Sequence, residues 1–337
     1  MEVAILGATG LVGQTFVKLL ETHPWFEIKR LIASQRSKGK RFDEVAVGNI
    51  PEDIGEIKIE SLSDFLKNPE VDLIFSALPS SIAWGVEEEL AKRVPVFSNA
   101  SSHRYEEDIP ILVPEVNGEH LNLIEVQKKE RGWKGFIVTN PNCSTAILAI
   151  SLKALSKFGI RRVNVVTMQA ISGAGFNGLS AMHIFDNVIP YIEKEEWKIE
   201  NESRKILGKL EKNKIMPVNF KISAITTRVP VSHGHTEAVF VDLDEDPTVG
   251  ELKKSLESFD PLRALKLPSY AKPLLYREVP QPKLHKDLGS GMTVTFGRME
   301  RIGEGKFKYI TLGHNLIRGA AGGSILNAEL AYMHGIL

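Results

Sequence analysis

Three evenly spaced glycines at the start of the chain constrain its fold more than any other feature. Residues Glu2 to Leu6 have the pattern of a short buried strand, which breaks at Gly7-Ala8-Thr9-Gly10-Leu11-Val12-Gly13 and continues as a helix to about Glu21. This spacing suits a tight turn, close approach of the backbone to a pyrophosphate, and a helix N-terminus directed at its charge. Glycines also serve ordinary turns, but their place between a strand and a helix favours a dinucleotide site.

The following segments alternate between strands and helices. Strands are expected at 28–33, 71–76 and 94–98, and a helix that runs to about Lys92 is expected between the last two of them. This alternation predicts a doubly wound parallel sheet of the Rossmann type, whose ligands lie at the carboxyl ends of the strands. Arg104 lies just past such an end and is a candidate anion ligand.

The second strand ends in Ser34-Gln35-Arg36-Ser37-Lys38-Gly39-Lys40-Arg41. An NAD site commonly has an Asp or Glu here to hold the ribose 2′-hydroxyl, whereas this segment offers hydroxyls and four cations. The segment therefore favours a 2′-phosphate, and hence NADP over NAD. The alternative is a solvated basic loop.

Beyond Gly159 the pattern changes. Helices are expected at 181–192, 202–210 and 316–334, and long strands at 163–171, 222–229, 236–243, 292–298 and 306–312. Because the strands lack regular helical crossovers, we expect an α+β domain with a largely antiparallel sheet. The expected division is 1–142 plus 315–337 for the nucleotide-binding domain, and 143–314 for a second domain, to which the family resemblance given below assigns catalysis and dimerisation.

Composition excludes several classes of protein. Lys+Arg and Asp+Glu are each 42 among 337 residues, which gives no support for a nucleic-acid or membrane-surface partner. A single cysteine excludes an intrachain disulfide framework and a multi-cysteine zinc site, and no metal site is expected. The N-terminus lacks the basic start of a signal peptide, and no apolar run approaches the roughly 20 residues that span a bilayer. We expect a cytoplasmic protein.

That cysteine lies in Asn140-Pro141-Asn142-Cys143-Ser144-Thr145, between an apolar β-forming run and a helix-forming run. Asn142 can cap the helix, and the helix N-terminus favours a thiolate, so a lowered thiol pKa and a nucleophile are expected. The alternative is a small buried residue, since free cysteine usually packs as one.

Two further segments carry groups suited to catalysis. Arg228-Val229-Pro230-Val231-Ser232-His233-Gly234-His235 places an arginine and two histidines at a turn between strands, where they could hold a carboxylate and move a proton. Glu202 and Lys205 lie three apart on one helix face, which by itself is an ordinary surface ion pair.

Taken together, these motifs resemble the aspartate-semialdehyde dehydrogenase family, in particular its archaeal and fungal branch. The resemblance runs in order through the glycine turn, Asn99 to Arg104, Asn140 to Thr145, Gln169 to Gly173, Arg228 to His235 and Asn315 to Gly322. It spans essentially the whole chain. The activity implied is NADPH-dependent reductive dephosphorylation of L-4-aspartyl phosphate to L-aspartate 4-semialdehyde through a cysteine thioester, a step in the biosynthesis of lysine, threonine, methionine and isoleucine.

The resemblance also implies a role for each matching residue. Cys143 would be the nucleophile, His235 the general acid and base, and Gln169 the group that orients the intermediate; His233 falls at a variable position. Arg228 would bind the substrate carboxylate and Glu202 its ammonium group, while Arg104 and Lys205 would bind phosphate. NADP would contact Gly7, Thr9, Gly10, Leu11, Val12, Gly13, Ser34, Arg36, Ser37, Lys38, Ser172, Gly173 and Asn315.

Three alternatives differ at identifiable residues. N-acetyl-glutamyl-phosphate reductases typically have Gly-Cys-Tyr where this chain has Asn142-Cys143-Ser144. Archaeal malonyl-CoA reductases resemble the dehydrogenases but bind no ammonium and no inorganic phosphate, so Glu202, Lys205 and Arg104 favour aspartyl phosphate. A non-catalytic NADP sensor could lose the cysteine or histidine, and neither is lost. The resemblance further implies a homodimer or homotetramer formed through the second sheet.

Overall fold

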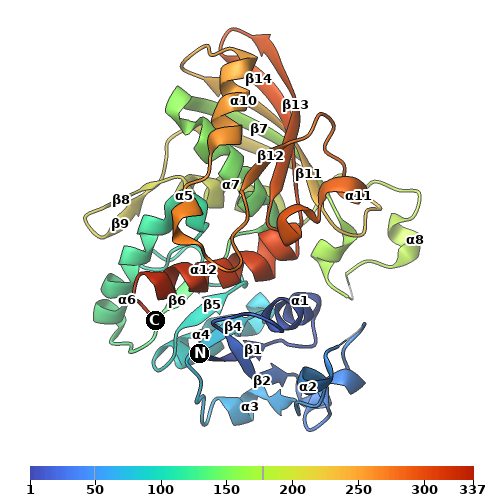
Figure 1. Ribbon diagram of the computed structural model, residues 1–337, viewed down its shortest axis with the longest axis vertical. Coiled ribbons are helices and arrows are strands. Elements are labelled where there is room, and N and C mark those ends of the chain that lie inside the picture. The colour runs from blue at the N-terminus through green and yellow to red at the C-terminus, as the bar shows by residue number, and fades with distance from the viewer. Residues whose placement is uncertain (49, 177) are drawn as a thin grey trace.

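The computed structural model describes residues 1–48, 50–176 and 178–337, and it contains two six-stranded sheets (Figure 1). The first sheet has the order β3-β2-β1-β4-β5-β6, and each adjacent pair in it is parallel. Its strands are β1 (Glu2–Leu6), β2 (Glu27–Ala33), β3 (Glu60–Ser61), β4 (Leu73–Ser76), β5 (Val96–Ser98) and β6 (Ile137–Thr139). The order reverses direction between β1 and β4, so the predicted Rossmann-type sheet and its ligand-binding crevice are confirmed.

Helices cover both faces of this sheet. Among those that contact its strands are α1 (Leu11–Leu20), α3 (Leu62–Phe65) and α4 (Ser80–Ala91). The same part of the chain also contains α2 (Glu52–Gly55), α5 (Pro114–Asn117) and α6 (Leu123–Arg131). Helix α1 is amphipathic and buries Phe16, Val17 and Leu20. Phe16 stacks on Phe75 of β4, with ring centroids 4.9 Å apart, which fixes α1 over the centre of the sheet.

The second sheet is mixed, with the order β10-β7-β11-β14-β13-β12. Its strands are β7 (Ile160–Gln169), β10 (Lys221–Arg228), β11 (His235–Leu243), β12 (Leu274–Tyr276), β13 (Val294–Gly303) and β14 (Lys306–Gly313). The three central pairs are antiparallel, as predicted, whereas β7–β10 and β12–β13 are parallel. A two-stranded ribbon of β8 (Lys209–Glu211) and β9 (Lys214–Met216) lies apart from it.

Three helices pack on one face of the second sheet, namely α7 (Cys143–Leu155), α9 (Glu195–Ile206) and α10 (Val249–Ser258). Because β11 alternates buried and more accessible residues, Val239 and Val241 join α7 in a continuous apolar core. The opposite face leaves Ile225 and Phe240 exposed.

The last helix returns to the first domain's core. A π-helical turn at Ile317–Ala321 leads into α12 (Gly322–Met333), whose Ile325, Leu326 and Leu330 share a core cluster with Val3 and Phe75. In Figure 1 this red helix lies between the two sheets, beside β5.

Two predicted helices were wrong in extent. The helix expected at 181–192 is limited to α8 (Ala181–Ile184), because Phe185 is extended and Asp186 adopts a left-handed conformation with a φ of +56°, which a helix cannot continue. The helix expected at 202–210 is the end of α9, which begins with Glu195 and Glu196 in its first turn, where carboxylates are favoured. The short helix α11 (Pro282–His285) and strand β12 were not predicted.

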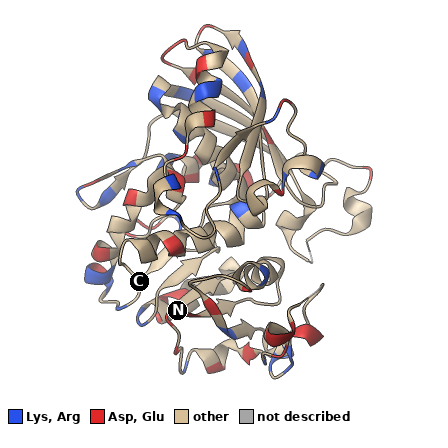
Figure 2. Ribbon diagram, in the orientation of Figure 1, with Lys and Arg blue, Asp and Glu red and all other residues tan. Residues whose placement is uncertain are grey.

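Lys and Arg alternate with Asp and Glu along the ribbon at both ends of the molecule (Figure 2). Among the helices described, none is both long enough and apolar enough to cross a bilayer.

Candidate active site

Cys143 is the first residue of α7, at the junction between β6 and that helix. The Asn142 side chain caps the helix by accepting hydrogen bonds from the backbone N–H groups of Ser144 and Thr145. Sγ of Cys143 lies 3.2 Å from Nε2 of His235, the first residue of β11. Two segments 92 residues apart thus form a thiol–imidazole pair.

The imidazole of His235 is held from its other nitrogen. The backbone N–H of Ala170 donates to Nδ1 at 3.0 Å, so the proton of the neutral ring is placed on Nε2, facing the sulfur. Burial lowers the pKa of His235 to about 3, and the nearby Arg228 cation acts in the same direction. His235 is therefore neutral at pH 7 and directs an N–H donor at Sγ.

The expectation of a lowered thiol pKa is wrong for this enclosed site. Burial raises the pKa of Cys143 to about 12, and the negative charge of Glu195 adds to the shift. The positive charge of Arg228 opposes it without overcoming it. Desolvation thus outweighs the helix N-terminus, and the resting pair is a thiol beside a neutral imidazole.

Gln169 and Arg228 are brought together by strand register. They end the parallel neighbours β7 and β10 and lie directly opposite one another. Nη1 of Arg228 donates to the carbonyl oxygen of Ala170 at 2.7 Å, and both side chains are almost fully buried while lining the same cavity as Cys143. An arginine held in this way presents its remaining N–H groups to an anion.

Two glycines allow the backbone to approach these groups. A Cβ on Gly173 would come within 2.7 Å of Nη1 of Arg228, and a Cβ on Gly319 within 2.7 Å of Cβ of Cys143. Gly319 belongs to the π-helical turn. Gly319, shortly before α12, therefore allows close contact between this turn and the cysteine.

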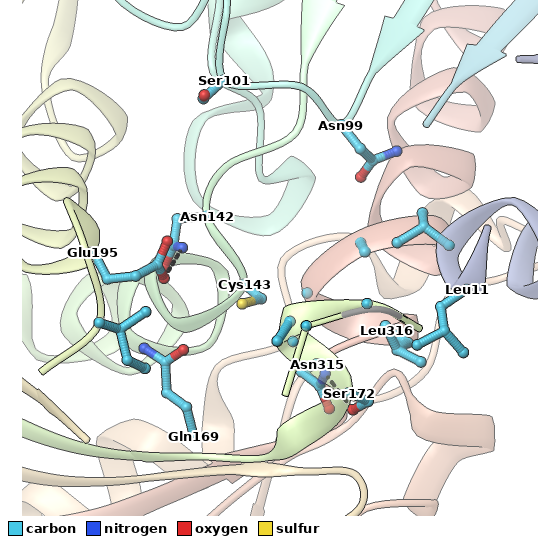
Figure 3. A pocket seen from close by; sticks show the side chains of 18 of the residues that line it. Leu11, Asn99, Ser101, Asn142, Cys143, Gln169, Ser172, Glu195, Asn315 and Leu316 are labelled. Atoms are coloured by element: carbon cyan, nitrogen blue, oxygen red, sulfur yellow. Dashed lines mark hydrogen bonds between the residues drawn. The ribbon is translucent and has the colours of Figure 1, made fainter. Parts of the chain in front are cut away.

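One cavity of about 640 Å³ joins the glycine turn to the cysteine. In Figure 3, Cys143 lies at its centre, with Gln169 below, Asn142 and Glu195 on one side, and Leu316 and Leu11 on the other. Of the predicted residues it is lined by Gly10, Leu11, Val12, Gly13, Arg104, Cys143, Gln169, Ser172, Gly173, Arg228 and Asn315. His235 lies directly behind the sulfur.

Glu202 is fully buried behind the cavity wall instead of lining it. One of its oxygens accepts from Nη1 of Arg104 at 2.9 Å, and the other accepts from the backbone N–H of Asn142 at 2.6 Å. Tyr105 donates to the first oxygen as well. Glu202 thus fixes Arg104 beside the N-terminus of α7, and an ammonium-binding role would require these bonds to change.

Lys205 also differs from the expectation. Its ammonium donates to the carbonyl oxygens of Arg104, Glu106 and Ile109 at 2.6–2.8 Å, which uses all three of its N–H groups. Burial lowers the pKa of Lys205 to about 8. Lys205 anchors the segment that carries Arg104, and it does not line the cavity.

A network of charges supports the same segment from the other side. Among the residues described, Glu88, His103 and Glu106 lie close enough together to hold a metal ion. Arg131 donates to both of these carboxylates and to Asp108, so this group acts as an ion-pair network.

The glycine turn has the geometry of an anion site. Gly7 has a φ of +75°, and a Cβ there would meet the carbonyl oxygen of Ala77 at 2.6 Å. Gly10 is the N-cap of α1, and no side chain caps that end of the helix. Its first N–H groups therefore point toward the cavity without a side-chain acceptor.

The remaining cofactor candidates lie outside this cavity. Gly7 and Thr9 form the inner part of the turn, while Ser34, Arg36, Ser37 and Lys38 follow the end of β2. Lys38 pairs with Asp64 at 2.6 Å at the surface. Arg36 is exposed and makes no ion pair with the residues described.

Sequence reasoning missed several residues of the cavity wall, notably Asn99, Ser101, Glu195 and Lys198. The first two follow the carboxyl end of β5, which was a usable signal. Glu195 and Lys198 were missed because the start of α9 was placed one and a half to two turns too late. Their signal is the repeated Glu-x-x-Lys spacing, seven residues before Glu202 and Lys205.

Comparison with known proteins agrees with this architecture. Residues 2–124 match the family model for the semialdehyde dehydrogenase NAD binding domain, and residues 152–318 match that for the semialdehyde dehydrogenase dimerisation domain. The chain is 50% identical over 335 residues to an aspartate-semialdehyde dehydrogenase of Archaeoglobus fulgidus, covering 98% of this chain and 97% of the relative. The chain belongs to the semialdehyde dehydrogenase family.

Two more distant relatives, one a sequence and one a solved structure, also match over nearly the whole chain. A malonyl-CoA reductase (NADP) of Metallosphaera sedula is 37% identical and covers all of this chain and 98% of its own length. A crystal structure of aspartate-semialdehyde dehydrogenase with NADP from Candida albicans superimposes with a TM-score of 0.88 at 37% identity, covering 100% of this chain and 99% of that one. The predicted family resemblance and fold class are thereby confirmed.

Proposed function

We propose that this chain catalyses the NADP-dependent interconversion of L-4-aspartyl phosphate and L-aspartate 4-semialdehyde plus phosphate. The observation that carries the proposal is the contact of 3.2 Å between Sγ of Cys143 and Nε2 of His235, in a cavity shared by Arg228 and the glycine turn. The relatives named above as aspartate-semialdehyde dehydrogenases, archaeal and fungal, support the choice of substrate.

The residues fit a nicotinamide dinucleotide. A pyrophosphate would bind at the uncapped N-terminus of α1, where Gly10 lines the cavity and a Cβ on Gly13 would strike the carbonyl oxygen of Gly7. Ser172, Gly173 and Asn315 continue the wall toward Cys143, and Arg36 and Lys38 are the cations available to a 2′-phosphate. When bound, the cofactor supplies the hydride that reduces the acyl group carried by the cysteine.

The chain's own residues supply the remaining chemistry. Sγ of Cys143 attacks the acyl carbon, so that a C–S bond forms and the C–O bond to the phosphoryl group breaks, and the thiol proton leaves with the phosphate as hydrogen phosphate. Arg228 binds the substrate carboxylate, Arg104 binds the phosphoryl oxygens, and Gln169 holds the acyl oxygen.

His235 handles the proton. Nε2 of His235 carries a hydrogen and faces Sγ. It can therefore donate a hydrogen bond or a proton to the sulfur, or to the oxygen of the acyl group bound to it, as either atom becomes negatively charged. In the reverse direction the same nitrogen receives the hydroxyl proton of the thiohemiacetal. The burial of His235 strengthens its interaction with the reacting atoms.

We also propose the division into a nucleotide-binding domain of residues 1–142 plus 315–337 and a catalytic and dimerisation domain of residues 143–314. Two observations support it. The core around β1 and β4 includes α12, and a separate core includes α7 with β7 and β11.

The test is nicotinamide absorbance with purified protein, NADP, phosphate and aspartate semialdehyde. We expect phosphate-dependent NADPH formation that Cys143→Ala abolishes, with Lys194→Gln as a matched surface control. Retention of turnover by Cys143→Ala, in a sample whose intact mass shows no wild-type protein, would contradict the proposal.

Malonyl-CoA reduction is the alternative, since a malonyl-CoA reductase is among the relatives. Glu202 and Lys205 do not line the cavity. Of the three residues expected to distinguish aspartyl phosphate from malonyl-CoA, only Arg104 does so. A parallel assay with NADPH and malonyl-CoA distinguishes the two: NADPH consumption there, without phosphate-dependent activity in the first assay, would favour the alternative.

For assembly we propose a homodimer or homotetramer in which a second copy covers the free face of the second sheet, where Ile225 and Phe240 are exposed. The matched dimerisation-domain model supports homo-oligomerisation. Light scattering after size-exclusion chromatography measures the mass, and Phe240→Lys should lower it. Residence in the cytoplasm stays a prediction from the sequence.

A further inference from the structure

The connection from β14 to α12 carries a buried histidine that the proposed mechanism does not use. His314 follows Gly313, the last residue of β14, and lies three residues before the π-helical turn at Ile317–Ala321. Its Nδ1 accepts hydrogen bonds from the backbone N–H groups of Leu316 at 3.2 Å and Ile317 at 3.3 Å. The imidazole therefore caps the start of the turn, where Leu316 supplies no side-chain cap of its own.

The main chain of His314 holds the same turn. Its carbonyl oxygen accepts from the backbone N–H of Gly319 at 3.1 Å, five residues further on, which is the hydrogen bond that defines a π-helix. Gly319 is the residue that packs on the nucleophile, since a Cβ there would lie 2.7 Å from Cβ of Cys143. The side chain and the carbonyl group of one residue thus fix the turn that encloses the cysteine.

The cap requires one particular form of the ring. Two N–H groups can share Nδ1 only when that nitrogen carries no proton, so the proton of the neutral ring is on Nε2, which lies 3.9 Å from Oδ1 of Asp287. Burial lowers the pKa of His314 to about 4, and the neighbouring His233 acts in the same direction. His314 is therefore neutral at pH 7, which is the form that can accept both hydrogen bonds.

Neighbouring side chains hold the ring in this orientation. His233 stacks on it, with ring centroids 5.5 Å apart and an angle of 17° between the two planes. Both rings line a groove on the other side of Leu316 from the cysteine cavity. The charged groups around the two rings are Asp287 and Lys286, which follow α11, and Lys18 and Glu21 of α1.

The residue after His314 connects this segment to the catalytic histidine. Oδ1 of Asn315 accepts from the backbone N–H of Gly234 at 2.9 Å, and Gly234 directly precedes His235. The segment that His314 caps thus meets the cysteine through its turn, and it meets the chain next to His235 through Asn315.

We propose that His314 is a positioning residue, whose neutral imidazole caps the π-helical turn and thereby keeps Cys143 in register with His235. This inference rests on the proposed function. His314 does not line the cysteine cavity, so it acts through the turn. Without the cap, two backbone N–H groups lose their acceptor, the turn shifts, and Sγ of Cys143 is no longer held 3.2 Å from Nε2 of His235.

The experiment compares two amide substitutions that imitate the two ring nitrogens. The side-chain oxygen of asparagine is as many bonds from Cα as Nδ1 is, and asparagine is a favoured N-cap, so His314→Asn should keep the cap. Glutamine places its oxygen one bond further, as Nε2 is, so His314→Gln should lose the cap.

Turnover is the first readout. For phosphate-dependent NADPH formation, kcat of His314→Gln should fall by roughly 10- to 100-fold, the cost of displacing a reacting group by up to about 1 Å, whereas His314→Asn should stay within about threefold of wild type. His334→Gln makes the same change at an exposed histidine at the end of α12 and should leave kcat unchanged.

The single cysteine gives a second readout. Because the turn packs on Cys143, its release in His314→Gln should speed alkylation of the thiol by iodoacetamide at pH 7.5, as measured by intact mass below the melting temperature of each variant. His314→Asn should restore the slow rate.

Two results would overturn the inference. One is a wild-type kcat and alkylation rate in His314→Gln, and the other is a loss in His314→Asn as large as that in His314→Gln, which would mean that the cap at Nδ1 is not what matters. Wild-type protein without phosphate-dependent activity would instead overturn the proposed function, and the alkylation rates would then still decide whether His314 positions the turn.

Discussion

Replacing Gly319 with alanine tests whether the π-helical turn positions the cysteine. The new Cβ would lie 2.7 Å from Cβ and 2.9 Å from Cα of Cys143. Carbon atoms normally pack at about 3.5–4.0 Å, so one of the two segments must move by roughly 1 Å. The Cα, Cβ and carbonyl oxygen of Cys143 are all fixed by the helical backbone, so they cannot rotate away as the far end of a side chain can.

A displacement of that size has a defined kinetic consequence. Misplacing a reacting group by about 1 Å costs roughly 100-fold in rate, so kcat of Gly319→Ala should fall by about that factor. Overpacking should also lower the free energy of unfolding by about 1–3 kcal/mol. The KM for NADP should change less, since the glycine turn lies at the other end of the cavity.

The assay is NADPH formation at saturating substrates, with a thermal melt and the iodoacetamide rate of Cys143 on the same samples. Gly85→Ala is the control, because a Cβ at that position in α4 would have nothing within 4 Å. Wild-type kcat and alkylation rate in Gly319→Ala would refute the reasoning, since they would mean that the contact relaxes without moving the sulfur.

Three further outcomes are expected. Burial lowers the pKa of His235 from 6.5 to about 3, so between pH 6.5 and pH 3 the unfolded chain binds one more proton than the folded chain. The free energy of unfolding should therefore fall as the pH drops from 6.5 to 3. In His235→Gln, urea titrations should show a fall that is smaller by about 1.4 kcal/mol per pH unit. Arg318→Met should cost about 3–5 kcal/mol, measured by denaturant unfolding, since it leaves the buried Glu115 carboxylate unpaired, and adding Glu115→Gln should recover part of it. Gly13→Ala should raise the KM for NADP more than that for phosphate, because its Cβ would lie 2.2 Å from the carbonyl oxygen of Gly7.

The first domain was predictable because its signals are local. Strand and helix periodicities, and glycines between them, identify β1 and α1 within a few residues. The junction at Cys143 was predictable for the same reason, since Asn142 is a strong N-cap.

Features that depend on tertiary packing were not predictable. The raised thiol pKa follows from burial beside the π-helical turn at Ile317–Ala321, which no local pattern reveals. The parallel pairing of β7 with β10, which brings Gln169 opposite Arg228, depends on a long connection. Lys205 does not line the cavity because it donates to three carbonyl oxygens of the 104–109 segment, which lies roughly a hundred positions away in the chain.

The place of α12 has a consequence for how the chain is made. This helix completes the apolar core of the first sheet, yet the entire second sheet precedes it in synthesis. During translation, part of the hydrophobic surface of the early strands therefore stays uncovered until nearly the whole chain has been synthesised. Domains made first usually fold first, but here the core of the earliest segment is completed last. The turn at Gly319 contacts Cys143 only after that, so the thiol becomes enclosed, and its pKa is raised, late in biogenesis.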